Sequence, residues 1–296
     1  MSIKTTINTP ENTLNYMKYV EIENDTRYPA VTGGQGQGVF NKSAILVQQV
    51  DPFNTGIGSG TGSQGYIEKF GANLSVNANI ETIWDAGGVY TYLTTASKLS
   101  AISDNLEDSL IGTGARLIEV EGLDVNYNTI TEVISCNATD GRNSGPESVN
   151  EFFRVYRAAV RTAGATGTNQ GFITIDANIG PVIAIGTHGV GVNEEGFGQS
   201  QTSVYTIPAG KTGYLTQWSV GSSDSSKKIH AYFMASEVDN GKIMRVKDVM
   251  FLNNYSIKDY KVPLTFAETT DIEVRAWDGS TGAAVSTSYN IILVDN

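Results

Sequence analysis

Residues 112–134, GTGARLIEVEGLDVNYNTITEVI, hold the clearest structural signal in this chain of 296 residues. Apolar and polar side chains alternate over residues 116–121, which is the period of a half-buried strand. Asp124 and Asn126 then interrupt the apolar pattern as turn formers do, and residues 129–134 are rich in β-branched side chains. The stretch therefore predicts an antiparallel hairpin.

The same pattern recurs along the chain and predicts an all-β protein with three parts. The first part, residues 1–65, contains the glycine tracts GGQGQG at 33–38 and GIGSGTGSQG at 56–65. Glycine loses the most backbone entropy on ordering, so these tracts favour an extended arm over helix or strand. Between them lies an apolar run that could pair with a neighbouring subunit or could be the first strand of the next domain: Ala44, Ile45, Leu46 and Val47.

Residues 66–198 are predicted to form a first antiparallel β-sandwich or jelly-roll-like domain. Residues 80–84 and 90–93 flank Asp-Ala-Gly-Gly, and residues 171–175 and 181–185 flank a second turn sequence, so each pair predicts a hairpin. Residues 152–160 alternate well enough for a further strand.

Residues 199–296 are predicted to form a second sandwich, after a polar linker at 187–199 that holds four glycines. The run 291–294 is apolar on both faces, so we expect it to be central in its sheet or covered. The expected strands are residues 204–207, 213–220, 229–235, 243–251, 262–266, 271–277 and 286–294.

Composition excludes several classes of function. Lys and Arg number 20 against 31 Asp and Glu, a net charge of −11, so we expect the surface to repel nucleic acid and anionic lipid. Cys136 is the only cysteine, which rules out an intramolecular disulfide and suits a reducing bacterial cytoplasm; we expect it to be buried. No signal peptide and no run of about 20 apolar residues is found.

Catalytic and metal-binding patterns are weak, and we expect neither enzyme activity nor a cofactor. His188 and His230 are the only histidines and have no cysteine partner nearby in sequence, so we expect a solvated loop residue and a structural strand residue. A glycosidase carboxylate pair remains open, because folding can bring together acidic residues that are distant in sequence.

Two groups of acidic and amide side chains resemble parts of cation sites, but turn formation explains them better. One group is Asp104, Glu107 and Asp108. The other, Asp124, Asn126 and Asn128, resembles the opening of a calcium loop, but threonine and serine stand where an EF-hand needs glycine and glutamate.

Four stretches resemble a family of virion structural proteins of marine and other environmental tailed phages. Together they reach from about residue 68 to the end, roughly three quarters of the chain. The resemblance implies a structural component of the phage particle, and within that class a capsid decoration or cement protein. The stretches are 81–93 (ETIWDAGGVYTYL), 112–127 (GTGARLIEVEGLDVNY), 203–215 (SVYTIPAGKTGYL) and 270–276 (TDIEVRA) with the ending IILVDN at 291–296.

The resemblance implies that this protein binds the major capsid protein on the outside of the shell after synthesis in the host bacterial cytoplasm. A homotrimer would match the threefold positions of an icosahedral shell and gain avidity from three contacts. The alternative is a head or tail fibre or adhesin that binds host glycan through stacking aromatics, namely Trp84, Tyr92, Trp218 or Trp277.

Overall fold

The computed structural model describes residues 64–177, 179–188, 195–224, 226, 228–236, 242–278 and 282–296, and the backbone of three strands before residue 31. The chain divides into two compact units, Met1–Ser63 and Gln64–Asn296. The described residues form strands, turns and irregular segments and contain no helix, which confirms the predicted all-β class. They accordingly include no helix long and apolar enough to cross a membrane.

The N-terminal unit contains a three-stranded antiparallel sheet in the segment predicted to be an extended arm. Up to Ser63 the glycine tracts lie outside the described residues, so the extended arm stays a prediction there. The apolar run Ala44, Ile45, Leu46 and Val47 lies outside the described residues, so its pairing stays a prediction. The strands are β1 (Lys4–Ile7), β2 (Lys18–Ile22) and β3 (Thr26–Ala30), in the order β1-β2-β3.

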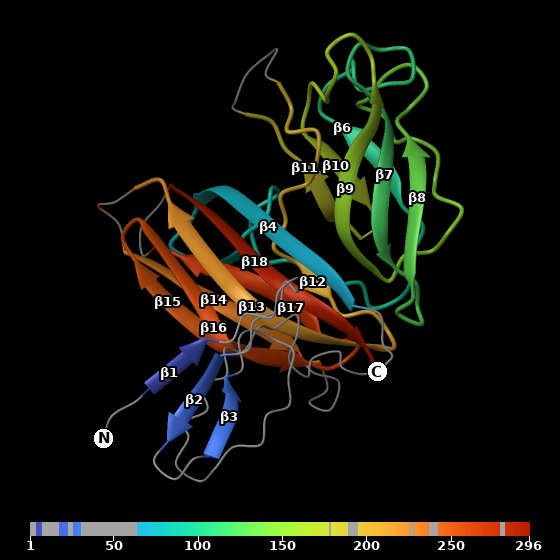
Figure 1. Cartoon of the computed structure of the whole chain (residues 1–296). Coiled ribbons are helices and arrows are strands. Elements are labelled where there is room, and N and C mark those ends of the chain that lie inside the picture. Colours follow the sequence, from blue (N-terminus) through green and yellow to red (C-terminus); the bar gives the residue numbers. More distant parts are fainter. Residues whose placement is uncertain are drawn as a thin grey trace. The chain divides into compact units, whose positions relative to one another are not determined.

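In the second unit a four-stranded sheet, β16-β13-β18-β4, and a five-stranded sheet, β12-β17-β14-β15 with β5 beside β17, form the larger of two sandwiches (Figure 1). Their inward side chains make one core, in which Trp218 and Phe233 are fully buried. The strands are β4 (Gln64–Val76), β5 (Glu81–Thr82), β12 (Tyr205–Thr206), β13 (Lys211–Ser222), β14 (Ile229–Ser236), β15 (Met244–Leu252), β16 (Tyr255–Phe266), β17 (Asp271–Trp277) and β18 (Ala283–Asp295).

The last strand shows why a run that is apolar on both faces needs cover. β18 lies between β13 and β4 in an antiparallel register with each, and Ile291 and Ile292, which point to opposite faces, are both buried. The predicted central position is confirmed.

The smaller sandwich pairs two three-stranded sheets, β8-β7-β9 and β11-β10-β6. The hairpin predicted from residues 112–134 is confirmed, since β7 and β8 pair antiparallel with Ile118 opposite Ile134. The hairpin of β10 and β11 is confirmed as well. Cys136 is buried in this core, as predicted. The strands are β6 (Ser100–Ser103), β7 (Ala115–Leu123), β8 (Thr129–Ser135), β9 (Arg154–Ala163), β10 (Ile173–Asp176) and β11 (Pro181–Ile185).

The strands do not all pair within the two sandwiches predicted over residues 66–198 and 199–296. β4 and β5 precede that position, yet β4 pairs with β18 and β5 pairs with β17. The smaller sandwich is therefore an insertion between β5 and β12 of the larger one. Sequence order could not reveal this, because the pairing partners of β4 lie more than 200 residues further along the chain.

The hairpin predicted around residues 85–88 is wrong in its second strand. The turn itself forms, with Gly87 and Gly88 both at φ 67°, a conformation that glycine adopts readily. Residues 90–93 form no strand, because the backbone N–H of Tyr90 donates to the side-chain oxygen of Thr82, at 2.9 Å, rather than to a partner strand.

Candidate functional site

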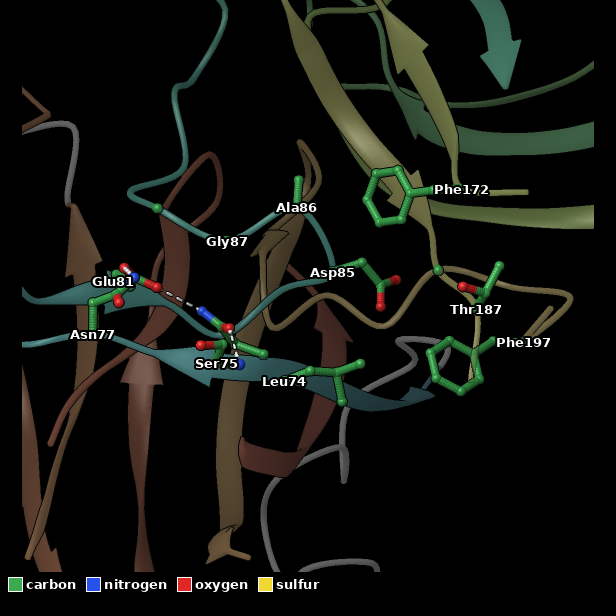
Figure 2. Close-up of a pocket in the computed structure, with 13 residues that line it drawn as sticks. Leu74, Ser75, Asn77, Glu81, Asp85, Ala86, Gly87, Phe172, Thr187 and Phe197 are labelled. Atoms are coloured by element: carbon green, nitrogen blue, oxygen red, sulfur yellow. Dashed lines mark hydrogen bonds between the residues drawn. The ribbon is translucent and has the colours of Figure 1, made fainter. Parts of the chain in front are cut away.

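A cavity of ≈ 400 Å³ lies where the turn after β5 meets the ends of β10 and β11 (Figure 2). Its lining combines two aromatic rings, Phe172 and Phe197, with carboxylates and amides. This combination makes it a candidate binding site for a small molecule.

Asp85, on the wall of this cavity, has a raised pKa. Its carboxylate accepts hydrogen bonds from the backbone N–H groups of Gln201, at 2.6 Å, and Gly186. Burial raises the pKa of Asp85 to about 7, and these two hydrogen bonds only partly offset that effect. Asp85 thus joins the larger sandwich to the chain that leaves β11.

Glu81 also lines the cavity, but its carboxylate is already hydrogen-bonded to two neighbouring amide side chains. It accepts hydrogen bonds from the side chains of Asn73, at 2.8 Å, and Asn77, at 2.5 Å. Figure 2 shows Glu81 beside Asn77 at one end and Asp85 near Thr187 at the other. The two carboxylates do not converge on a common point, as hydrolysis of a glycosidic bond between them would require.

The two histidines lie apart, where the sequence places them. His188 is exposed on a loop against the ring of Phe197, and His230 lies in β14 between the rings of Phe251 and Trp277. Over the described ranges, no three His, Cys, Asp or Glu side chains gather as metal ligands would.

The turn formation predicted for the first acidic group, Asp104, Glu107 and Asp108, explains only part of its bonding, since Asp104 and Asp108 also bind residues 170–172, more than 60 positions away. Asp108 is fully buried and accepts hydrogen bonds from the backbone N–H groups of Ala115, Gln170 and Gly171 at 2.7 to 2.9 Å and from the Ser103 hydroxyl at 2.7 Å. Glu107 accepts from the backbone N–H of Thr113, at 3.0 Å, and Asp104 accepts from that of Phe172, at 2.8 Å.

The second group, which resembled the opening of a calcium loop, forms the turn between β7 and β8. Asp124 Oδ1 accepts hydrogen bonds from the backbone N–H groups of Asn126 and Asn128, at 2.8 and 2.9 Å. These hydrogen bonds lower the pKa of Asp124. The turn-forming role predicted for these residues is confirmed.

Of the four aromatics proposed for glycan stacking, two are buried and unable to meet a sugar. Trp84 is 4% exposed and Trp218 is fully buried. Tyr92 is half-buried beneath the guanidinium of Arg154, 5.1 Å from its ring centre. Trp277 is half-buried as well, with the ring centre of His230 4.7 Å from its own.

The outer face of the four-stranded sheet carries exposed apolar side chains on both of its edge strands. On β4, Tyr66 and Phe70 are 53% and 40% exposed, and on β16, Tyr255 and Ile257 are 60% and 48% exposed. The register places small hydroxyl side chains between them on β13 and β18, such as Ser219, whose Oγ lies 2.8 Å from that of Ser288. We call these four apolar residues the edge patch.

Sequence reasoning missed the buried charges. Lys69 on β4 and Arg154 on β9 are 9% and 6% exposed, although both residue types usually lie on surfaces. Side-chain alternation could not have found Lys69, since it places the apolar residues Tyr66 and Phe70 on the opposite face and so predicts an exposed lysine.

Comparison with known proteins gives no family assignment. No protein-family model and no curated protein matches the chain. Among solved structures, the infectious bursal disease virus Gx strain aligns at 10% identity and a TM-score of 0.17, over 83% of this chain and 75% of the other. The VP2 subviral particle of the same virus aligns at 10% identity and a TM-score of 0.15, over 84% and 81%. TM-scores this low establish no common fold.

Proposed function

We propose that this chain is a structural protein of a tailed-phage particle, and within that class a capsid decoration protein that binds the outer surface of the major capsid shell and stabilises it. Four stretches that resemble such virion proteins support the proposal, and they fall on both sandwiches. The role is non-catalytic, in keeping with carboxylates and histidines that lie apart.

The edge patch is the observation that carries the proposal. Its aromatic and aliphatic side chains stand at both margins of a sheet face, with hydroxyl side chains between them. Exposed apolar side chains of this kind favour a protein partner over water, and a broad sheet face suits a flat protein surface better than a small ligand. The major capsid protein is the partner of this face.

A homotrimer on the capsid exterior completes the proposal. Three copies related by a threefold axis would engage three equivalent capsid contacts at once, so that weak contacts add up to stable binding. A net charge of −11 opposes association through charge alone, so the contacts bury apolar surface. Native mass spectrometry of the free protein should show a trimer, and a strict monomer would contradict this part.

Copy number tests the assignment most directly. In purified particles we expect this band, scaled to the major capsid band, to correspond to on the order of hundreds of copies. About a dozen copies would indicate a fibre or tail component instead.

Substitutions in the edge patch test the contact. Phe70→Asp and Ile257→Asp should each abolish binding of purified protein to particles that lack it, because a carboxylate would be forced against an apolar contact. Val149→Asp, at a residue that is 82% exposed on the smaller sandwich, is the matched control and should bind normally. Normal binding by both patch variants would contradict the proposed face.

A further inference from the structure

A second cavity, of ≈ 200 Å³, lies beside β4 where β9 approaches it. Lys69 is on its wall and is 9% exposed. The antiparallel register puts Lys69 in line with Tyr289 and Trp218, both core residues, so its side chain points to the inner face of the sheet. Lysine is almost never fully buried unless it is paired, so we ask what could pair with Lys69.

The ammonium group of Lys69 has more donors than partners. Its Nζ donates one hydrogen bond to the backbone carbonyl of Tyr156, at 2.5 Å, and the ring of the same tyrosine is 5.9 Å away. An ammonium has three N–H donors. No carboxylate in the described part of the chain forms an ion pair with Lys69, since Glu121, which lines the same cavity, is bound to Arg157.

Burial of the charged Lys69 ammonium costs free energy unless a counter-ion contacts it. Desolvation, with a smaller contribution from the nearby Arg157, lowers the pKa of Lys69 to about 7, while Glu121 acts in the opposite direction. An anion that contacts Nζ would replace the lost hydration of the ammonium and raise this pKa again.

The neighbouring groups decide which anion fits. Ser200 Oγ accepts a hydrogen bond from the N–H of Ala158, at 3.0 Å, so its own O–H is left to donate to a ligand. Glu68 and Glu121 also line the cavity and would repel a doubly charged anion such as phosphate. The volume admits only a small group.

We propose that this cavity binds one carboxylate group, with Lys69 as its cationic partner and Ser200 as a hydrogen-bond donor. The carboxylate belongs either to a free small acid or to an aspartate or glutamate side chain of a bound polypeptide. Tyr66, exposed at the margin of the cavity, would contact whatever carries it. The inference concerns the free protein and does not depend on capsid binding.

Acetate is the probe. At pH 6.5 we expect sodium acetate to raise the melting temperature of the full chain saturably, relative to sodium chloride at equal ionic strength, and to shift the amide signals of residues 156 and 200 in NMR spectra. Lys69→Met should abolish both effects. Lys98→Met, at an exposed lysine, should leave them unchanged. An acetate effect no larger than that of chloride, or one retained in Lys69→Met, would overturn the proposal.

The wild-type protein supplies a test that does not depend on the folding of any variant. The acetate effect should fall at least tenfold between pH 6.5 and pH 9, as Lys69 loses its proton, and a constant effect would overturn the proposal. The other titratable or charged groups facing the cavity are Glu68, Glu121, Arg157, Tyr66, Tyr156 and Tyr205. Burial raises the pKa of Tyr156 to about 12, and the pKa values of Tyr66 and Tyr205 are raised as well, which keeps these phenols neutral over most of this range.

Two capped tripeptides distinguish the sources of the carboxylate. Acetyl-Gly-Glu-Gly-amide should compete with acetate, and acetyl-Gly-Gln-Gly-amide should not. A glutamate peptide that binds at least tenfold more tightly than acetate would assign the site to a polypeptide side chain, and weaker binding would assign it to a free acid. If the glutamine peptide competes equally well, recognition does not depend on the carboxylate and the proposal fails.

Discussion

At the scale of single residues, the ion pair between Arg154 and Asp271 joins the two sandwiches. Arg154 on β9 donates from Nε and Nη2 to the two carboxylate oxygens of Asp271 on β17, at 2.8 and 3.0 Å, and from Nη1 to the Leu93 carbonyl at 2.9 Å. The two side chains are only 7% and 3% exposed. A pair of this kind is far more sensitive to loss of one partner than a surface pair is.

Arg154→Met should therefore lower the free energy of unfolding by about 3–5 kcal/mol, because it leaves the Asp271 carboxylate buried without its main partner. Denaturation in urea measures the change. Arg142→Met is the matched control, since Arg142 pairs with Asp140 in an exposed turn where the side chains are 58% and 29% accessible. We expect its midpoint to match that of the wild type, and equal losses in both variants would contradict the structural role of Arg154.

Asp85 should make stability depend on pH. Its pKa of about 7 in the folded protein lies above the value near 4 of an unfolded chain, so the folded state holds this proton to higher pH. The free energy of unfolding therefore falls as pH rises from about 4 to about 7. Asp85→Asn has no proton to lose, and its side-chain oxygen can still accept from Gln201.

The variant should consequently gain stability relative to the wild type by on the order of 1–3 kcal/mol between pH 4 and pH 8, at about 1.4 kcal/mol per unit of pKa shift. Melting temperatures of both proteins across this range provide the measurement. Parallel curves would show that Asp85 titrates normally in the folded protein.

At the scale of elements, the close approach of β4 to neighbouring backbone depends on a glycine. A Cβ atom added at Gly71 would lie 2.5 Å from both the Ile83 carbonyl oxygen and the Ser203 backbone nitrogen, whereas at Gly65 on the same strand the nearest atom is 3.7 Å away. Backbone atoms cannot yield as the end of a flexible side chain can.

Gly71→Ala should thus destabilise the fold by about 1–3 kcal/mol or more, and Gly65→Ala should change stability by less than about 0.5 kcal/mol. Chemical denaturation of the two variants beside the wild type measures both effects. Similar stability of the two would mean that β4 does not pass this close to the backbone of residues 83 and 203.

At the scale of the whole molecule, the unit Gln64–Asn296 contains both sandwich cores, so it should fold without the preceding unit. A chain that begins at Ser63 should keep the melting temperature of the second unit. Because the composition of residues 1–65, with its glycine tracts, predicts a tether that orders on the capsid, this shortened chain should lose most particle binding.

A cosedimentation assay with purified particles tests this, with circular dichroism as the control for folding. A shortened chain that still saturates the particles would show that the first 62 residues are not needed for attachment. A shortened chain that does not fold would show that the second unit depends on the first.

Much of the fold could be predicted because local patterns dictate it. Alternation over residues 116–121 and the Asp124 turn predict the β7–β8 hairpin, and the two-sided apolar run at 291–294 predicts a central strand. In each case the information lies within a few consecutive residues. The buried position of Cys136 follows in the same way from residue type.

The contacts of the buried charged residues could not be predicted, because they join residues that only folding brings together. Lys69 meets Tyr156 from 87 positions away, and Arg154 meets Asp271 from 117 positions away. Glu273 on β17 is fully buried and accepts a hydrogen bond from the Thr82 hydroxyl, 191 positions away, at 2.8 Å.

The sequence by itself thus determined the class of fold, most of the strands and the turns, since these follow from side-chain period and turn residues. Only the tertiary structure decided that β4 and β5 belong to the larger sandwich and that Lys69 faces a cavity. The physical reason is that strand pairing and burial of charge depend on contacts between distant segments, and one strand's pattern is compatible with many partners.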